Sequence, residues 1–314
     1  MSPRILVTGG SGFVGGHVVA ALRESGGATP PPVRLLLRDP AALTPDRAPA
    51  ADVVRGDLAD PASLRGVCEG VDVVLHCASH IGDDPRLTET VNDHGTRALV
   101  EEATRAGATR IVYVSTAAVY GRGPFTAALP GEPPLAPTSP TSRARAAAER
   151  HVLDAGGAVL RPHLVLGTGD RWVVPGLATL MGALKARLKG CEARHSVVDV
   201  RALGRAVAAA GLSEHGLSGV HHVNRPQPVN GSELLDTVAD RLGLRLPGAP
   251  VDVDEARTRL AGQPRALHHL GMLAVDHWFA DDGFWDAVGA DHGVGFAGSM
   301  AEHGPWYGEF VQRG

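Results

Sequence analysis

Short apolar runs alternate with longer amphipathic stretches through the first half of the chain. The apolar runs have the continuous character of strands buried on both faces, and they fall at residues 5–7, 33–37, 53–55, 72–76, 110–114 and 158–161. Stretches with apolar residues at helical spacing lie between them, most clearly at residues 87–106 and 141–155. Strands that alternate with helices predict an α/β fold with a doubly wound parallel sheet of the Rossmann type.

The pattern becomes mixed after residue 165. We expect helices at residues 174–188, 201–210 and 231–242, strands at 196–198 and 220–223, and an irregular tail rich in histidine and aromatic residues from about Gln263. Asp199 is expected to cap the helix that follows it. Residues 121–140, rich in Pro, Gly and Ala, predict a loop long enough to act as a lid. We therefore expect a Rossmann core at residues 1–165 and a smaller C-terminal substrate-side lobe at residues 166–314 that interleaves with it.

The turn after the first strand carries the strongest chemical signal. Gly9 allows a tight turn, Gly12 lets a pyrophosphate approach the backbone, and Gly15 lets the next helix pack closely on the strand. The N-terminus of that helix offers N–H groups and a partial positive charge to phosphates. We therefore predict a dinucleotide site whose contacts come from Gly9, Ser11, Gly12, Phe13, Val14 and Gly15.

The end of the second strand bears on which dinucleotide binds. Arg38 is the first residue after that strand, about 20 residues past the glycine turn, where the adenosine ribose lies. A guanidinium pairs with the 2′-phosphate of NADP, whereas a carboxylate holds the 2′-hydroxyl of NAD. Arg38 therefore favours NADPH or NADP as the cofactor, and Asp39, the next residue, keeps NAD as the alternative.

Two further strand ends add candidate cofactor contacts. Asp57 can accept a hydrogen bond from the adenine amino group or cap the segment after it, and Leu58 follows it. Small residues that let a cofactor lie close to the backbone follow the fourth strand, namely Cys77, Ala78 and Ser79. Because the carboxyl ends of parallel strands share one edge of a sheet, we expect these residues to meet the glycine turn there.

Composition narrows the classes of partner. The formal net charge is −4 and no basic block occurs, which argues against a nucleic-acid partner. No apolar stretch reaches the ~18 residues of a membrane helix, and the chain starts almost directly with a strand, so we expect neither a membrane span nor a signal peptide. Cys68, Cys77 and Cys191 lack CxxC spacing and are expected to be reduced thiols of a cytoplasmic protein. His268, His269 and His277 do not have a recognised ligand spacing, so we expect no metal.

Taken together, these motifs resemble the extended short-chain dehydrogenases/reductases, also called the NAD-dependent epimerase/dehydratase superfamily. The matching stretches are residues 8–15, 56–58, 91–96, 112–116, 119–121, 160–162, 198–201 and 222–224. The resemblance implies the fold predicted above, a nicotinamide cofactor and a small-molecule substrate. It also implies cofactor contacts along the chain that passes the nicotinamide, at Pro162, His163, Leu164 and Val165, and a substrate pocket near Thr116 and Tyr120. The tail matches the family only loosely, and Trp278 there either lines a pocket for a flat substrate or packs the lobe.

The chain departs from the family at the residues that carry its chemistry. Members of the family use a Ser and a Tyr to hold a carbonyl oxygen, and a Lys four residues after the Tyr to lower its pKa and hold the ribose. Ser115 matches the serine, but Thr141 stands at the tyrosine position and Arg145 at the lysine position. The resemblance therefore assigns the catalytic positions to Ser115, Thr141 and Arg145, the last also at the cofactor ribose.

This double replacement leaves three hypotheses open. A threonine hydroxyl cannot reach a near-neutral pKa as a phenol can, and Arg145 stays protonated at any working pH. The first hypothesis is a ketoreductase in which Ser115 and Thr141, with water or a substrate hydroxyl, stabilise the oxyanion, as implied by atypical family members that act on aromatic polyketides. The second is a non-redox epimerase, lyase or cyclase that uses residues such as His163. The third is an NADP-sensing binding protein. The oligomeric state stays open.

Overall fold

The fold is built on a seven-stranded, all-parallel sheet. The computed structural model describes residues 2–25, 30–42, 52–82, 84–214 and 216–313. The strand order is β12-β7-β5-β4-β1-β2-β3. These strands are β1 (Ile5–Thr8), β2 (Val33–Leu37), β3 (Asp52–Arg55), β4 (Val73–His76), β5 (Arg110–Val114), β7 (Ala158–Arg161) and β12 (Gly219–His222). Every neighbouring pair is parallel, which confirms the predicted doubly wound α/β sheet.

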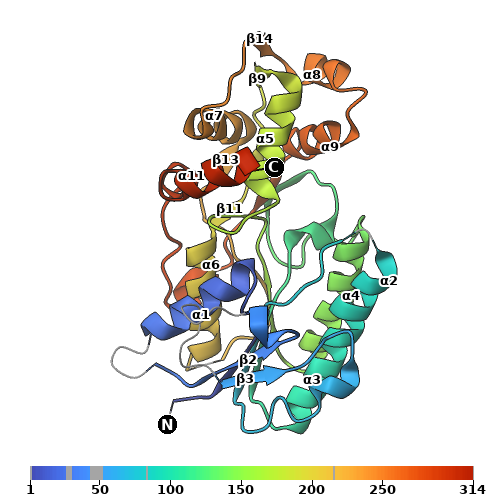
Figure 1. Cartoon of the computed structure of the whole chain (residues 1–314), viewed down its shortest axis with the longest axis vertical. Helices are drawn as coiled ribbons and strands as arrows, with labels where there is room; N and C mark the ends of the chain where they lie inside the picture. Colours follow the sequence, from blue (N-terminus) through green and yellow to red (C-terminus); the bar gives the residue numbers. More distant parts are fainter. Residues whose placement is uncertain (1, 26–29, 43–51, 83, 215, 314) are drawn as a thin grey trace.

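Helices cover both faces of this sheet. In Figure 1, α1 (Phe13–Ser25) and α6 (Val200–Leu212) lie on one side, and α3 (Gly95–Arg105) and α4 (Pro140–Asp154) lie on the other. Two apolar cores result, one on each face, and the strands bury residues such as Ile5 and Leu6 completely. The strand order reverses at β1, whose neighbours are β2 and β4. A crevice outside the carboxyl ends of the strands at such a reversal is where α/β sheets bind ligands.

The second half of the chain forms a separate helical lobe and also returns to the main sheet. The lobe packs α5 (Val173–Leu184), α7 (Gly231–Leu242), α8 (Val253–Arg259), α9 (Pro264–Leu273) and α11 (Phe296–Arg313) around its own apolar core (Figure 1). Its short strands β9 (Ala186–Leu188) and β14 (Gly248–Val251) pair with each other. By contrast, α6 and β12 join the Rossmann layer, and the short helix α10 (Phe284–Val288) contributes Phe284 and Trp285 to its core.

Three predicted segments differ from the structure. The tail expected to be irregular from about Gln263 contains the helices α9, α10 and α11. The helix expected at residues 174–188 ends at Leu184, because Lys185 adopts a left-handed conformation (φ 54°) and the chain continues as β9. The loop expected at residues 121–140 contains a strand, β6 (Phe125–Ala128). This strand pairs with β15 (His277–Phe279) in a small sheet of order β13-β10-β15-β6, where β10 is Arg194–His195 and β13 is Val229–Asn230. The proposed lid is therefore anchored to the C-terminal part of the chain.

Within the described ranges, no helix combines the length and the apolar character that crossing a membrane requires.

Candidate active site

The glycine turn forms an open cradle at the start of α1. Gly9 has φ +69°, and a Cβ there would lie 2.8 Å from backbone atoms of Ala78, so no other residue fits without strain. A Cβ on Gly15 would overlap the carbonyl oxygen of Gly9. A Cβ on Gly12 would meet only that same oxygen, at 3.2 Å, among the described atoms within 4 Å. The space in front of Gly12 is therefore free for a pyrophosphate, next to the unpaired N–H groups of the first helical turn at Phe13.

The residues after β2 differ in the contacts that their side chains make. Asp39 is turned back to its own chain, because its Oδ1 accepts the N–H of Ala41 at 3.0 Å. Arg38 is exposed, and no described residue forms a hydrogen bond or an ion pair with its guanidinium. The register of β2 and β3 places Arg55 opposite Leu37, so a second exposed guanidinium ends the neighbouring strand.

Asp57, the predicted contact of the adenine amino group, already has a hydrogen-bond partner in its own turn. Asp57 Oδ1 accepts the N–H of Ala59 at 2.9 Å in a local turn. The cap of the following 3₁₀ segment, η2 (Pro61–Leu64), is Asp60 and not Asp57. The side chain of Leu58 is buried and packs near Gly95, so only its backbone faces the cofactor edge.

Side-chain hydrogen bonds hold the segment after β4 in place. The hydroxyl of Thr8 joins His76 Nδ1 at 2.7 Å and the N–H of Ala78 at 3.1 Å. Asn92 accepts the N–H of His80 at 2.7 Å and donates to its carbonyl at 2.9 Å, and Ser79 Oγ also donates to Asn92. Burial raises the pKa of the Cys77 thiol to about 12, so this side chain is neutral and serves as packing. Asn92 thus holds the loop Cys77–Ser79 in place from a π-helical segment, η3 (Thr90–His94).

Thr141 and Arg145 lie together on the first turns of α4. The helix starts there because Ser139 and Ser142 form a capping box and Pro140 occupies the first turn. Arg145 Nη2 donates to the carbonyl of Val114 at 2.5 Å, which aims the guanidinium at the end of β5. Its Nε is buried and has no hydrogen-bond partner among the described residues. A buried N–H donor without an acceptor is what a ribose hydroxyl of a bound nicotinamide cofactor would satisfy, so the residues present fit that group.

Ser115 is buried against α4. It is 1% exposed, and its hydroxyl donates a short hydrogen bond to the buried carboxylate of Glu149. Successive residues of an extended segment point to opposite sides, so the neighbour Thr116 is the half-buried hydroxyl at this turn. Thr116 caps the following 3₁₀ turn by accepting the N–H of Ala118 at 3.2 Å, which leaves its own proton free to donate.

Tyr120, the predicted pocket residue, is buried in a hydrogen-bonded cluster. It is 2% exposed, accepts from Arg161 Nη1 at 2.7 Å and contacts His222 Nε2 at 2.8 Å. Burial lowers the pKa of His222 to about 4, so this imidazole is neutral and accepts the phenolic proton. Burial also raises the pKa of Tyr120. Arg161 in turn pairs with Glu149 through Nε, at 3.0 Å, and through Nη2.

The chain that was expected to pass the nicotinamide is fixed by its backbone. Pro162 accepts the N–H of Ala117 at 2.8 Å, and the N–H of His163 donates to Asn224 Oδ1 at 2.8 Å. Leu164 and Val165 then enter β8 (Leu164–Leu166), which pairs with β11 (Val197–Asp199). The ring of His163 turns away from this backbone toward the helical lobe, where it packs against two other imidazoles.

An apolar pocket of about 180 Å³ opens beside His163. Its lining is mainly aliphatic, aromatic and imidazole groups: His163, Leu164, Trp172, Val173, Leu177, His195, His269, Met272 and Leu273. Trp172, 56% exposed, is its aromatic wall. Trp278, the predicted substrate residue, does not line this pocket, since it stacks under the guanidinium of Arg194 at 4.2 Å. No sequence signal singled out Trp172 or His195, because their neighbours come from distant parts of the chain.

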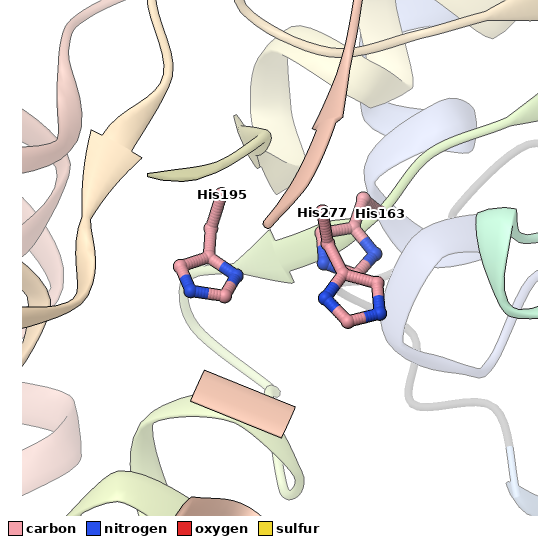
Figure 2. Close-up of side chains that lie close together, drawn as sticks. All are labelled: His163, His195 and His277. Atoms are coloured by element: carbon pink, nitrogen blue, oxygen red, sulfur yellow. The ribbon is translucent and has the colours of Figure 1, made fainter. Parts of the chain in front are cut away.

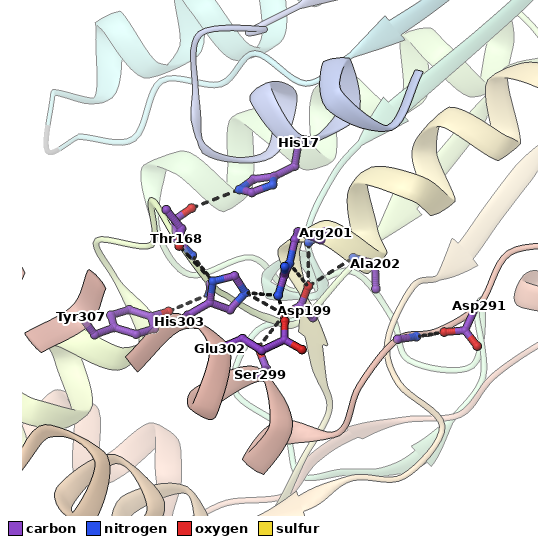
Figure 3. Close-up of polar contacts among 12 residues, drawn as sticks. His17, Thr168, Asp199, Arg201, Ala202, Asp291, Ser299, Glu302, His303 and Tyr307 are labelled. Atoms are coloured by element: carbon purple, nitrogen blue, oxygen red, sulfur yellow. Dashed lines mark hydrogen bonds and ion pairs between the residues drawn. The ribbon is translucent and has the colours of Figure 1, made fainter. Parts of the chain in front are cut away.

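Hydrogen bonds between Asp199 and α11 join the helical lobe to the Rossmann core. Asp199 caps α6 through the N–H groups of Arg201, at 2.8 Å, and Ala202, as predicted. Its second oxygen accepts from Ser299 at 2.6 Å and from His303 Nε2 at 3.0 Å, as Figure 3 shows. Burial alone would raise the pKa of Asp199, but the hydrogen bonds from His303 and Ser299 hold it well below its ordinary value.

Comparison with known proteins places this geometry in a family. The model of the NAD dependent epimerase/dehydratase family matches residues 5–192. The 3 beta-hydroxysteroid dehydrogenase/Delta 5-->4-isomerase of Mycobacterium tuberculosis is 28% identical over 313 residues, which cover 90% of this chain and 82% of the relative. The 2-alkyl-3-oxoalkanoate reductase of Stenotrophomonas maltophilia is 26% identical, with 93% and 97% covered.

Solved structures agree on the fold. The dTDP-glucose 4,6-dehydratase DesIV of Streptomyces venezuelae, with NAD and TYD bound, superposes with a TM-score of 0.76 at 23% identity and covers 98% of this chain and 97% of its own. The Bordetella bronchiseptica enzyme WbmH in complex with NAD+ also has a TM-score of 0.76, at 21% identity, with 99% and 100% covered. The family model spans more than half of the sequence and includes the glycine cradle, so the chain belongs to the NAD-dependent epimerase/dehydratase family, the extended short-chain dehydrogenases/reductases.

Proposed function

We propose that this protein is an NADPH-dependent ketoreductase of secondary metabolism that reduces a ketone on a bulky, angucyclinone-like aromatic polyketide. The observation that carries the proposal is Thr141 and Arg145 standing in an otherwise intact cofactor site, where the family has tyrosine and lysine. The ketoreductase that acts on the angucyclinone of simocyclinone biosynthesis is the individual enzyme that this double replacement, with the character of the tail, most resembles.

In this proposal, different residues around the glycine turn contact different parts of the cofactor. Gly12 and the start of α1 receive the pyrophosphate, and Arg38 pairs with the 2′-phosphate. Arg145 donates from its unpartnered Nε to a ribose hydroxyl, in the place of the usual lysine. When bound, NADPH supplies the hydride that reduces the carbonyl carbon. Since Asp39 is turned to Ala41, the carboxylate that would favour NAD is directed away from the ribose.

The hydroxyls of Thr116 and Thr141 hold the carbonyl oxygen of the substrate in this proposal. Both are half-buried at adjoining turns, and the proton of Thr116 is free because its oxygen accepts the N–H of Ala118. Neither titrates near neutral pH, so they stabilise the developing oxyanion without giving up a proton. A phenolic hydroxyl of the substrate, already hydrogen-bonded to its own ketone, or a water molecule then supplies the proton.

The pocket favours a flat apolar substrate over a nucleotide sugar. Among the described residues that line it, none is Lys or Arg, the residues that usually neutralise a diphosphate. Trp172 offers a wide aromatic face at the open end, and Leu177 and Met272 supply apolar contacts. Two relatives that match 90% or more of the chain are named a 3 beta-hydroxysteroid dehydrogenase/Delta 5-->4-isomerase and a 2-alkyl-3-oxoalkanoate reductase.

The test is turnover on a matched pair of ketones. Purified protein is mixed with NADPH and two aromatic ketones that differ only in the hydroxyl peri to the carbonyl, free in one and methylated in the other. We expect NADPH oxidation with the free phenol and a kcat/KM at least ~10²-fold lower with the methyl ether, because the internal proton donor is lost.

Two other outcomes would replace this proposal. Product without a net change in NADPH would indicate an epimerase, lyase or cyclase on the same fold. Tight NADPH binding with no turnover of any carbonyl would indicate a cofactor-sensing protein.

A further inference from the structure

Three histidines from separate parts of the chain meet beside the apolar pocket. His163 lies between β7 and β8, His195 ends β10, and His277 begins β15. The strands β10 and β15 pair in parallel with His195 opposite His277. One ring nitrogen of each residue lies within 4.8 Å of one of each other residue, as the cluster in Figure 2 shows. Of the three tail histidines only His277 belongs to this cluster, since His268 and His269 lie on α9.

Hydrogen bonds to backbone carbonyls fix the tautomers of two of these rings. His277 Nδ1 lies 2.9 Å from the carbonyl of Val275, and His195 Nε2 lies 3.0 Å from the carbonyl of Leu273. A carbonyl only accepts, so both of these nitrogens carry the proton. The lone pairs of His277 Nε2 and His195 Nδ1 are therefore left for another partner. A second nitrogen held by a carbonyl is the usual support of a metal-ligating histidine.

No protein donor satisfies these lone pairs. His277 is 2% exposed, and its Nε2 is buried without a hydrogen-bond partner among the described residues. The ring nitrogens of His163 likewise form no hydrogen bond with any described residue.

We propose that His163, His195 and His277 bind one divalent transition-metal ion, Zn²⁺ or Co²⁺, with an open coordination position toward the apolar pocket. Imidazole is a preferred ligand of both ions, and three protein ligands with one open position are typical of a reactive zinc site. His163 and His195 line the pocket, whereas the buried His277 does not, so we assign the open position to the pocket side.

The spacing of the rings suits one ion. Their centroids are 5.3, 6.0 and 6.3 Å apart, and three imidazoles at Zn–N distances of about 2.0–2.1 Å would place theirs about 5–6 Å apart. The rings lie within 15° of parallel, so binding requires one of them to rotate about its Cβ–Cγ bond, a torsion that is broad for histidine. His163 can do so, because its ring forms no hydrogen bond with a described residue. This site departs from the sequence expectation of no metal, which considered only the histidines of the tail.

A second group with ligand spacing is a weaker candidate and supplies a control. Glu89, Asp93 and His94 also bring ligand atoms within 4.8 Å, but the group is largely exposed. Asp93 is already paired with His151 at 2.7 Å. Exposed acidic groups of this kind are common without an ion, so loss of His94 should not change specific binding.

The test is cobalt and zinc binding by the whole protein, without NADPH or ketone, so that it is independent of the proposed activity. We expect one Co²⁺ per chain with the intense visible bands of a four-coordinate site, and X-ray absorption of the Zn²⁺ complex that counts three imidazoles. His163→Asn and His195→Asn should each weaken binding at least ~10-fold. The controls His94→Asn and His268→Asn, the latter at an exposed position of α9, should bind as the native protein does.

Each result is decisive for the proposed site. Fewer than three imidazoles in the native complex would overturn it, even if the variants misfold. Unchanged affinity in both His163→Asn and His195→Asn would also overturn it, as would loss of binding in His94→Asn. Retained NADPH binding by the variants, measured separately, shows that they are folded.

Discussion

Replacing Ser115 and Thr116 one at a time separates a structural hydroxyl from a catalytic one. The two residues are adjacent in sequence, yet Ser115 donates to the buried carboxylate of Glu149 and Thr116 caps an exposed turn. Ser115→Ala removes a hydrogen bond to a charged group, which we expect to lower the free energy of unfolding by about 1.5–3 kcal/mol. The same change should leave kcat/KM within about threefold of the native value, because the hydroxyl does not face the pocket.

Thr116→Val should have the opposite profile. Loss of the cap to the N–H of Ala118 costs about 0.5–2 kcal/mol of stability. Loss of one donor to the oxyanion should reduce kcat by about 10²–10³. Thr116→Ser keeps the hydroxyl and serves as the matched control, with near-native values of both quantities.

Urea unfolding and NADPH oxidation measure the two effects on the same preparations. The reasoning fails if Ser115→Ala loses more than about 100-fold in kcat/KM while Thr116→Val remains active, since that result would return the catalytic role to Ser115.

Three further substitutions test separate parts of the site. Arg38→Ala should weaken NADPH binding by about 10–100-fold, since a charged hydrogen bond contributes about 1.5–3 kcal/mol, and should leave NADH binding unchanged. Calorimetry measures both affinities, and equal changes for the two cofactors would contradict a role at the 2′-phosphate. Tyr120→Phe should keep most of the activity but lose about 1–3 kcal/mol of stability in urea, because Arg161 loses an acceptor; a loss of activity above about 100-fold would make Tyr120 the acid. Asp199→Asn should destabilise the protein at pH 7. A carboxyl whose pKa is depressed in the folded state stabilises the fold above its ordinary pKa, and this contribution is lost as the pH falls through the folded value. The free energies of unfolding of native protein and variant should therefore approach each other below about pH 4. A difference that stays constant with pH would refute the argument.

The Rossmann sheet could be predicted because its signals are local. Each strand is a short apolar run, and the turn at Gly9 needs its glycine for reasons that involve only nearby backbone. The strand β6 could not be predicted in the same way, since its partner β15 lies far along the chain. The end of α5 at Lys185 depends on a left-handed conformation and on β9 pairing with β14, which no helical periodicity reveals.

In the candidate site, too, the residues that local signals indicate could be predicted, and those that depend on distant contacts could not. The residues expected at the cofactor lie at strand ends that the topology brings together, so spacing alone could nominate Gly12 and Arg38. The choice between Ser115 and Thr116 depends on which hydroxyl meets Glu149, a contact between a strand and a distant helix. Long-range contacts also decide which tryptophan lies at the pocket: Trp278 stacks with Arg194, and Trp172 lines the pocket.

The central claim, carbonyl reduction by NADPH without a catalytic tyrosine, is tested most directly by isotope transfer. The protein is incubated with NADPH carrying deuterium at both nicotinamide C4 positions and with the hydroxylated aromatic ketone, and the product is analysed by mass spectrometry. We predict an alcohol with one deuterium on the former carbonyl carbon. A product without deuterium, or no alcohol although NADPH is bound, would contradict the account.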